Sequence, residues 1–284
     1  MNTQMNINIF EAFAGYGSQC MALDRLHSVH PEFSYELVGW SEIDKNAIHA
    51  HNAVYPQWSD RNYGDISKVD WANVPDFDLF TYSFPCQAVS SAGLQKGLSE
   101  GSGTTSSLLW ECRRAITAKH PTFMLMENVK ALTQKKFMPD FGKWIDFCKS
   151  EGYVNFWKVL NAKDFGVPQN RERVFMVSIH KSAIDKYPDR YSCGIHYEFP
   201  CGFPLVPRLK DVLETYHDDK VLDEKYYLTD AQINHRIQWT ANTTSGHAFK
   251  PREGGGIGVA VLAGSQRTDD NWIKEYKDGQ QPSD

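Results

Sequence analysis

Short apolar runs alternate with stretches of helical periodicity through the first two-thirds of the chain. Strands that alternate with helices are typical of βαβ units, which build a mainly parallel sheet. We therefore predict an α/β fold with helices on both faces of the sheet. The expected strands are 6–10, 35–40, 78–82 and 123–126, with 156–160 and 174–179 paired near the sheet edge; the expected helices end near residue 26 and cover 45–54, 108–118 and 141–149.

The composition changes near Tyr187, where four prolines within 187–207 suit a linker. A polar region with a glycine cluster at Gly254–Gly258 follows. We divide the chain into a domain at 1–190 and a smaller region at 191–284. The net charge is −5, so phosphate contacts of the second region would depend on a few basic residues. Those are Arg208, Arg236, Lys250, Arg252 and Arg267.

Several classes of protein are disfavoured by the sequence. No apolar run approaches the ~18 residues of a membrane span, and the N-terminus does not resemble a secretory signal. The six cysteines form no CxxC pair and no zinc-type cluster, so we expect reduced thiols, no metal and a cytoplasmic location.

A glycine-rich turn, Phe10–Gly17 (FEAFAGYG), follows the first expected strand and precedes a helix. Glycines there allow positive φ and a close approach of the backbone to a ligand. The helix start behind them favours an anionic group. Cys20 stands where a dinucleotide fingerprint has its third glycine, so the turn predicts either a nucleotide-like cofactor loop or a plain tight turn.

Two carboxylates follow at positions that suit the same cofactor. Glu42, just after the second expected strand, is placed to hold ribose hydroxyls, or else to stabilise the start of helix 45–54. Asp65, in Gly64-Asp65-Ile66, is either an acceptor for an adenine amine or an Asx turn.

Cys86 follows the third expected strand within Ser83-Phe84-Pro85-Cys86-Gln87. Ligands of α/β proteins bind at this end of the strands, and a thiol there can act as a thiolate nucleophile. The alternative is an inert buried thiol. The polar segment Ser90–Ser107, with four glycines, has the length and composition of a mobile lid and favours the first interpretation.

Charged residues mark two further strand ends. Glu127 comes directly after the strand 123–126. It is either a general acid or a strand-end carboxylate paired with Lys130. Arg171 and Arg173 precede the strand 174–179, and β alternation would point both to one face, where they either hold substrate oxygens or form a solvated strand start.

These motifs, in this order, resemble the cytosine-C5 DNA methyltransferase family. FAGYG resembles its cofactor loop, SFPCQ its nucleophile motif, ENV its acid motif and QNRER its Q-x-R-x-R motif. The resemblance extends from Ile9 to Ile179. It implies a Rossmann-like S-adenosylmethionine-dependent methyltransferase sheet, S-adenosylmethionine as methyl donor and a flipped cytosine of double-stranded DNA as substrate.

The resemblance also implies a role for each residue. Cys86 would attack C6 of cytosine, Glu127 would hold and protonate N3, Arg173 would hold O2, and Arg171 would brace the nucleophile loop or the cytosine. The residues that would line the cofactor pocket are Phe13, Ala14, Gly15, Tyr16, Gly17, Glu42, Ile43, Asp65, Ile66, Pro85 and Leu108.

The sequence departs from the family after Arg173. The family continues through a target-recognition region to a G-N-S-V-like segment, which we do not find, and 191–284 resembles only part of the recognition region. Three explanations stay open: a truncated chain, one half of a split enzyme whose second chain carries the missing motifs, or a degraded prophage copy. An RNA methyltransferase of the same fold and a non-catalytic remnant also stay open, whereas the incomplete glycine fingerprint and SFPCQ disfavour an oxidoreductase.

Overall fold

The computed structural model describes residues 5–86, 98–99, 101, 103–207, 209–212, 231 and 258–259. The chain forms two compact units. The large unit contains Met1–Val159 and Arg173–Phe199, and the small unit contains Leu160–Glu172 and Pro200–Asp284. Much of the predicted lid (90–97, 100 and 102) and all five candidate phosphate-binding residues of the C-terminal region lie outside the described residues.

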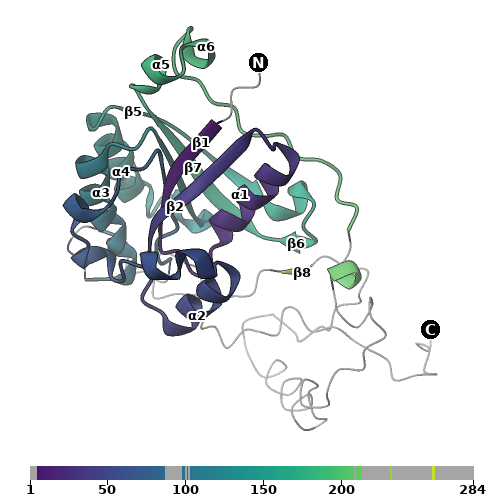
Figure 1. The fold of residues 1–284 in the computed structure, drawn as a ribbon. Helices are drawn as coiled ribbons and strands as arrows, with labels where there is room; N and C mark the ends of the chain where they lie inside the picture. Colours follow the sequence, from purple (N-terminus) through teal and green to yellow (C-terminus); the bar gives the residue numbers. More distant parts are fainter. Residues whose placement is uncertain are drawn as a thin grey trace. The chain divides into compact units, whose positions relative to one another are not determined.

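A six-stranded sheet in the order β2-β1-β3-β4-β7-β5 forms the centre of the fold (Figure 1). Neighbouring strands are parallel from β2 to β4, and β7 runs antiparallel to β4. The predicted α/β class is therefore confirmed. The strands are β1 (Met5–Ala12), β2 (Phe33–Ser41), β3 (Leu79–Tyr82), β4 (Phe123–Val129), β5 (Tyr153–Asn161) and β7 (Glu172–His180).

The first two helices begin at residues that suit a helix start. Gly17 precedes the first helix with a left-handed φ of 88°, and the Asp44 side chain caps the second by accepting from the N–H groups of Asn46 and Ala47. The helices are α1 (Ser18–Val29), α2 (Lys45–Val54), α3 (Cys112–Lys119), α4 (Met138–Ser150), α5 (Ala183–Lys186) and α6 (Pro188–Tyr191), with 3-10 turns η1 (Pro56–Arg61), η2 (Ile66–Lys68), η3 (Trp71–Asn73), η4 (Thr105–Glu111), η5 (Lys130–Thr133), η6 (Ala162–Phe165) and η7 (Leu209–Val212).

The helix expected at 108–118 differs from the structure at its start. Leu108 lies in the 3-10 turn η4, and the α-helix begins at Cys112. Buried residues here recur three apart, at Leu109, Cys112 and Ala115, a spacing that a 3-10 turn and an α-helix bury equally well. The apolar pattern therefore located the segment without distinguishing the two helix types.

The sheet buries a different set of side chains on each face. Along β1, Ile7 and Ile9 pack in a cluster with Cys20 of α1 and Trp40 of β2, whereas Phe10 and Ala12 pack with residues of α3 and α4. This alternation is the period of two that a strand buried on both faces requires. Accordingly, α3 and α4 lie on one side of the sheet and α1 on the other (Figure 1).

In the small unit, η6 is followed by the short strand β6 (Gln169–Asn170), which pairs in parallel with β8 (Gly258–Val259). Phe203 packs edge-on against Phe165, with ring centroids 6.2 Å apart, and its N–H donates to the Asp164 carbonyl at 2.9 Å. Among the described helices, none is long and apolar enough to cross a membrane.

Candidate active site

One row of the sheet brings the predicted motifs to a common edge. Ala12 of β1 is in register with both Ser41 of β2 and Tyr82 of β3, and Tyr82 is in register with Met126 of β4. The glycine turn, Glu42, Cys86 and Glu127 come immediately or shortly after these residues. Arg173, opposite Val129, is the second residue of the antiparallel β7 and lies at the same edge.

The glycine turn adopts the backbone conformation that its sequence predicts. Gly15 and Gly17 have φ of 58° and 88°, in the left-handed region. A Cβ on Gly17 would lie 2.8 Å from the Tyr55 ring, so side chains are excluded there. A Cβ on Gly15 would meet nothing within 4 Å, so the turn presents bare backbone to open space at this residue.

Glu42 organises this turn. One carboxylate oxygen accepts the Gly15 N–H at 3.0 Å, and the other accepts the N–H groups of Ile43 and Asp44 at 2.8 and 2.9 Å. The alternative role of Glu42, stabilising the start of the second helix, is performed by Asp44 instead. Glu42 therefore joins the end of β2 to the glycine turn.

Asn62 fixes the backbone around Glu42, and sequence reasoning missed it. Its Oδ1 accepts the N–H groups of Glu42 and Gly64 at 3.2 and 2.9 Å, and its Nδ2 donates to the Glu42 carbonyl at 3.2 Å. A single asparagine before a Gly-Asp turn is too common a pattern to have predicted this.

Asp65 forms the Asx turn that was one of its two predicted roles. Its Oδ1 accepts from the backbone N–H and the hydroxyl of Ser67 at 3.0 and 2.8 Å, and these hydrogen bonds lower the pKa of Asp65. Ile66, the next residue, is buried in the core.

Two large apolar side chains beside Glu42 are exposed. Tyr16 is 55% exposed and Ile43 is 68% exposed. Of the other predicted cofactor residues, Phe13 and Leu108 are half-buried, and Ala14 is buried. The carboxylate, the open glycine and the exposed apolar surface suit a ligand that has both hydroxyl groups and a flat ring.

The segment that ends at Cys86 is held by two buried side chains. Asn128 of β4 donates its Nδ2–H to the Phe84 carbonyl at 2.9 Å, and Ser106 of η4 donates its hydroxyl to the Pro85 carbonyl at 2.7 Å. The half-buried Cys86 follows directly. On the other side, Gln19 of α1 donates to the Ser83 hydroxyl at 3.3 Å.

The other cysteines have environments unlike that of Cys86. Cys20, Cys112 and Cys148 are buried, and burial raises the pKa of each thiol. Cys193 and Cys201 are exposed, and neither follows one of the strand ends that form this edge in the sequence. Only Cys86, of the six, combines partial burial with a place beside the other predicted catalytic groups.

Glu127 and Arg173 form an ion pair across β4 and β7. Arg173 Nε lies 3.0 Å from Glu127 Oε1, and the side chains are 15% and 20% exposed, respectively. Glu127 lies within β4, which continues to Val129. Two of the predicted catalytic residues are therefore in direct contact.

Arg171 lies in the small unit, between β6 and β7, so the strand alternation expected to align it with Arg173 does not reach it. Its N–H donates to Asn161 Oδ1 at 3.0 Å, and its carbonyl accepts the Ala162 N–H at 3.0 Å. These bonds fix the backbone of Arg171 within its own unit.

Glu11, in β1 next to the glycine turn, is a buried carboxyl that sequence reasoning also missed. It accepts from the Gln19 N–H at 3.4 Å and from the Cys20 thiol at 3.3 Å. Burial raises the pKa of Glu11 to about 7. An acid at the end of a strand that is otherwise buried is the signal that could have revealed it.

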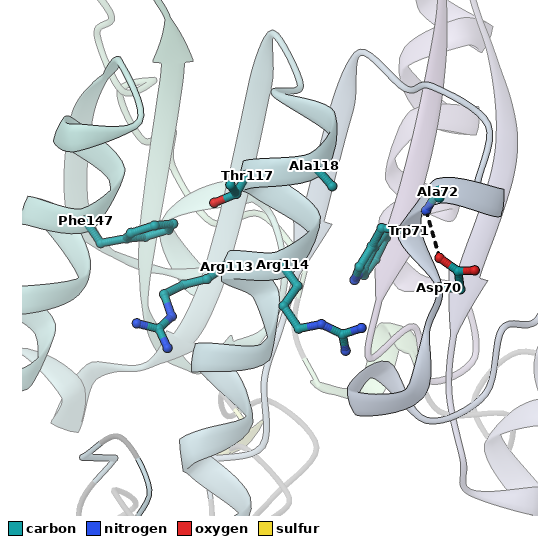
Figure 2. Close-up of a pocket in the computed structure, with 8 residues that line it drawn as sticks. All are labelled: Asp70, Trp71, Ala72, Arg113, Arg114, Thr117, Ala118 and Phe147. Carbon is teal, nitrogen blue, oxygen red and sulfur yellow. Dashed lines mark hydrogen bonds between the residues drawn. The ribbon is translucent and has the colours of Figure 1, made fainter.

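A cleft of about 570 Å³ lies elsewhere, between η3, α3 and α4 (Figure 2). Its two arginines have structural roles: Arg113 stacks on Trp110 at 5.2 Å, and Arg114 donates to the carbonyls of Ser67 and Val69 at 2.7 and 2.8 Å. No predicted site residue lines it. Nor do the described residues contain a cluster of His, Cys, Asp and Glu that could bind a metal.

The fold and this edge define a class of protein, α/β proteins in which a glycine turn and a half-buried thiol follow adjacent parallel strands. The family model for C-5 cytosine-specific DNA methylases matches residues 7–283. The chain belongs to this family of DNA methyltransferases, and the resemblance found in the sequence is confirmed.

Individual proteins agree with this assignment. The type II methyltransferase M2.ScrFI of Lactococcus lactis subsp. cremoris is 36% identical over 279 residues, covering 80% of this chain and 72% of that protein. The type II methyltransferase M.SsoII of Shigella sonnei is 31% identical over 283 residues, covering 98% of this chain and 65% of that protein. The S. pombe Dnmt2 methyltransferase shares the fold, with a TM-score of 0.58 at 17% identity over 88% of this chain and 69% of that chain.

Proposed function

We propose that this protein transfers a methyl group from S-adenosylmethionine to carbon 5 of cytosine in duplex DNA. The observation that carries the proposal is the register row Ser41–Ala12–Tyr82–Met126, which gathers the cofactor turn, the thiol and the Glu127–Arg173 pair at one edge. The relatives M2.ScrFI and M.SsoII are type II methyltransferases, which favours a DNA substrate.

The residues around Glu42 fit S-adenosylmethionine. The Glu42 carboxylate suits ribose hydroxyls, the exposed Ile43 side chain suits an adenine face, and the open backbone at Gly15 suits the methionine part. When bound, S-adenosylmethionine supplies an electrophilic methyl group. The predicted pocket residues from Phe13 to Gly17, with Asp65, Ile66, Pro85 and Leu108, would complete the site.

The chemistry assigned to the other residues follows from the low nucleophilicity of cytosine C5. A bond from the Cys86 thiolate to C6 would make C5 electron-rich enough to take the methyl group. A base would then remove the C5 proton and the thiolate would leave, so this covalent route divides one difficult step into two. Glu127 would hold and protonate N3 as charge develops, and Arg173, which pairs with Glu127, would hold O2. The target base must leave the stack to reach Cys86, which costs a few kcal/mol.

The direct test uses the purified chain, labelled S-adenosylmethionine and duplex DNA that carries 5-fluorocytosine. Fluorine at C5 blocks the release of the thiol, so we expect a covalent adduct that disappears in Cys86→Ala and persists in Cys193→Ala, a change at an exposed cysteine. S-adenosylmethionine binding without any adduct would contradict the proposal for this chain acting alone.

Two further experiments test the alternatives of an RNA substrate and of a split enzyme. Adducts on RNA but not on DNA would support an RNA methyltransferase. Adducts that form only when a second chain with the G-N-S-V-like segment is added would support a split enzyme. The proposal fits a cytoplasmic protein and leaves its biological setting open between restriction–modification, orphan and phage roles.

A further inference from the structure

The loop before Cys86 contains two consecutive backbone carbonyls, each of which accepts a hydrogen bond from a buried side chain. Asn128 donates to the Phe84 carbonyl at 2.9 Å and Ser106 to the Pro85 carbonyl at 2.7 Å. The two donors come from different elements, β4 and η4, and both side chains are buried. The loop is therefore held from two directions just before the thiol.

The Ser106 bond controls the peptide that carries Cys86. A peptide unit is planar, so a hydrogen bond that fixes the Pro85 carbonyl also fixes the N–H and Cα of Cys86. Proline already restricts φ at residue 85 and has no N–H with which to make a backbone bond of its own. The carbonyl bond is thus an effective constraint on the orientation of the last peptide before the thiol.

Ser106 itself is held firmly. Its 3-10 turn is capped by Thr104, whose side chain accepts the Ser107 N–H at 3.3 Å, and Trp110 in the same turn donates to the Leu98 carbonyl at 2.7 Å. A fully buried hydroxyl needs a partner, and here it has a carbonyl beside the nucleophile.

We propose that Ser106 is a positioning residue, whose hydroxyl holds the Pro85 carbonyl and thereby aims the Cys86 thiol at its target. This inference rests on the function proposed above for its catalytic consequence, but the constraint on Cys86 is a property of the protein without substrate. A positioning error of about 1 Å at a reacting group can cost a hundredfold in rate.

The test compares Ser106→Ala with Ser107→Ala. Both changes remove one hydroxyl from the same turn, but the Ser107 hydroxyl donates to the Thr104 carbonyl at 2.7 Å, whereas the Ser106 hydroxyl donates to the Pro85 carbonyl. Two rates are measured: adduct formation with 5-fluorocytosine DNA in a single turnover, and alkylation of each cysteine by iodoacetamide, followed by peptide mass spectrometry.

If Ser106 positions the thiol, its loss should slow adduct formation and speed up alkylation of Cys86. In Ser106→Ala we expect adduct formation to slow roughly tenfold to a hundredfold, because the thiol is no longer aimed. Alkylation of Cys86 should become severalfold faster, because the half-buried thiol is less restrained. Ser107→Ala should match the wild type in both rates, and Ser106→Thr, which keeps the hydroxyl, should recover part of the adduct rate.

Internal controls separate this result from unfolding. Cys193 and Cys201 are exposed and should be alkylated equally fast in every variant, whereas Cys112 and Cys148 are buried and become reactive only if the core opens. Faster alkylation of Cys112 and Cys148 together with Cys86 would indicate a purely structural role and overturn the proposal. Equal Cys86 alkylation in wild type and Ser106→Ala would overturn it as well.

The two proposals fail independently. If the wild type forms no adduct with any substrate, the proposed function fails, and the alkylation of Cys86 alone decides whether Ser106 restrains the thiol. If the wild type forms adducts and Ser106→Ala does so at the same rate, the methyltransferase proposal stands and the role of Ser106 is rejected.

Discussion

The ion pair between Arg173 and Glu127 fixes two long side chains that would otherwise sample many rotamers. Both are largely buried, and the pair is 3.0 Å apart. A charge-assisted hydrogen bond of this kind is directional, so it sets the plane of the carboxyl group as well as its position. That orientation is what a group that must hold and protonate a ring nitrogen requires.

Glu127→Gln tests this residue without changing its shape. The amide keeps a carbonyl oxygen for Arg173 but has no proton to give, so we expect adduct formation with 5-fluorocytosine DNA to fall by about 100-fold or more. The exposed Glu198 provides the control, because Glu198→Gln should leave the rate unchanged. An unchanged rate in Glu127→Gln would remove Glu127 from the mechanism.

Glu11 makes folding stability depend on pH. Burial raises the pKa of Glu11 from 4.5 to about 7, so between these values the unfolded chain releases a proton that the folded protein retains. The stability associated with the protonated form is complete below about pH 4.5 and is lost as the pH rises through 7. Glu11→Gln, which cannot ionise, should therefore be more stable than the wild type at pH 8, by up to about 3 kcal/mol.

Urea denaturation of both proteins at pH 5, 6, 7 and 8 measures the difference in free energy of unfolding. The advantage of Glu11→Gln should shrink steadily towards pH 5. A difference that is independent of pH would mean that Glu11 has an ordinary pKa in the folded protein.

At the scale of elements, the turn after β1 depends on two glycines in different ways. Both have left-handed φ, but only at Gly17 would a Cβ collide with a neighbour, the Tyr55 ring at 2.8 Å. Gly15 faces open space. We therefore expect the first glycine to leave room for a ligand, whereas the second lets the Tyr55 ring lie against the start of α1.

The two alanine substitutions should separate these roles. Gly15→Ala should lower the free energy of unfolding by about 1–2 kcal/mol, because alanine disfavours the left-handed backbone. Gly17→Ala adds a steric clash and should lower it further. Thermal unfolding measured by circular dichroism checks whether Gly17→Ala is the less stable of the two variants. Equal losses at both sites would show that the Tyr55 ring moves aside without penalty.

The sequence predicted the elements better than the contacts between them. Apolar periodicity located β1 to β4 and α2 because strands and helices bury side chains at fixed intervals. It could not distinguish η4 from α3, because buried residues three apart suit both helix types. Contacts made by Asn62, Ser106 and Asn128 depend on loops that meet only in the folded chain, so no local pattern revealed them.

At the scale of the whole molecule, binding of a cofactor by the folded state alone should stabilise the chain. A ligand at 100 times its Kd contributes about 2.7 kcal/mol, so S-adenosylmethionine should raise the Tm by several degrees. Glu42→Gln should weaken this shift, since the carboxylate holds the Gly15 N–H and faces the proposed ribose site. Differential scanning fluorimetry over a range of cofactor concentrations measures it; no shift in the wild type would contradict cofactor binding by this chain alone.

The register of Ala12 limits how far the proposed cofactor turn can lie from the loop that carries Cys86. Ala12 pairs on one side with Ser41 and on the other with Tyr82, so the turn that follows β1 and the loop that carries Cys86 leave the sheet from adjacent strands. Adjacent strands are about 4.8 Å apart, a spacing set by backbone hydrogen bonds and insensitive to side chains. The sheet therefore fixes the distance between the two points at which the proposed cofactor turn and the loop of the proposed nucleophile leave it, whatever the sequences of the loops.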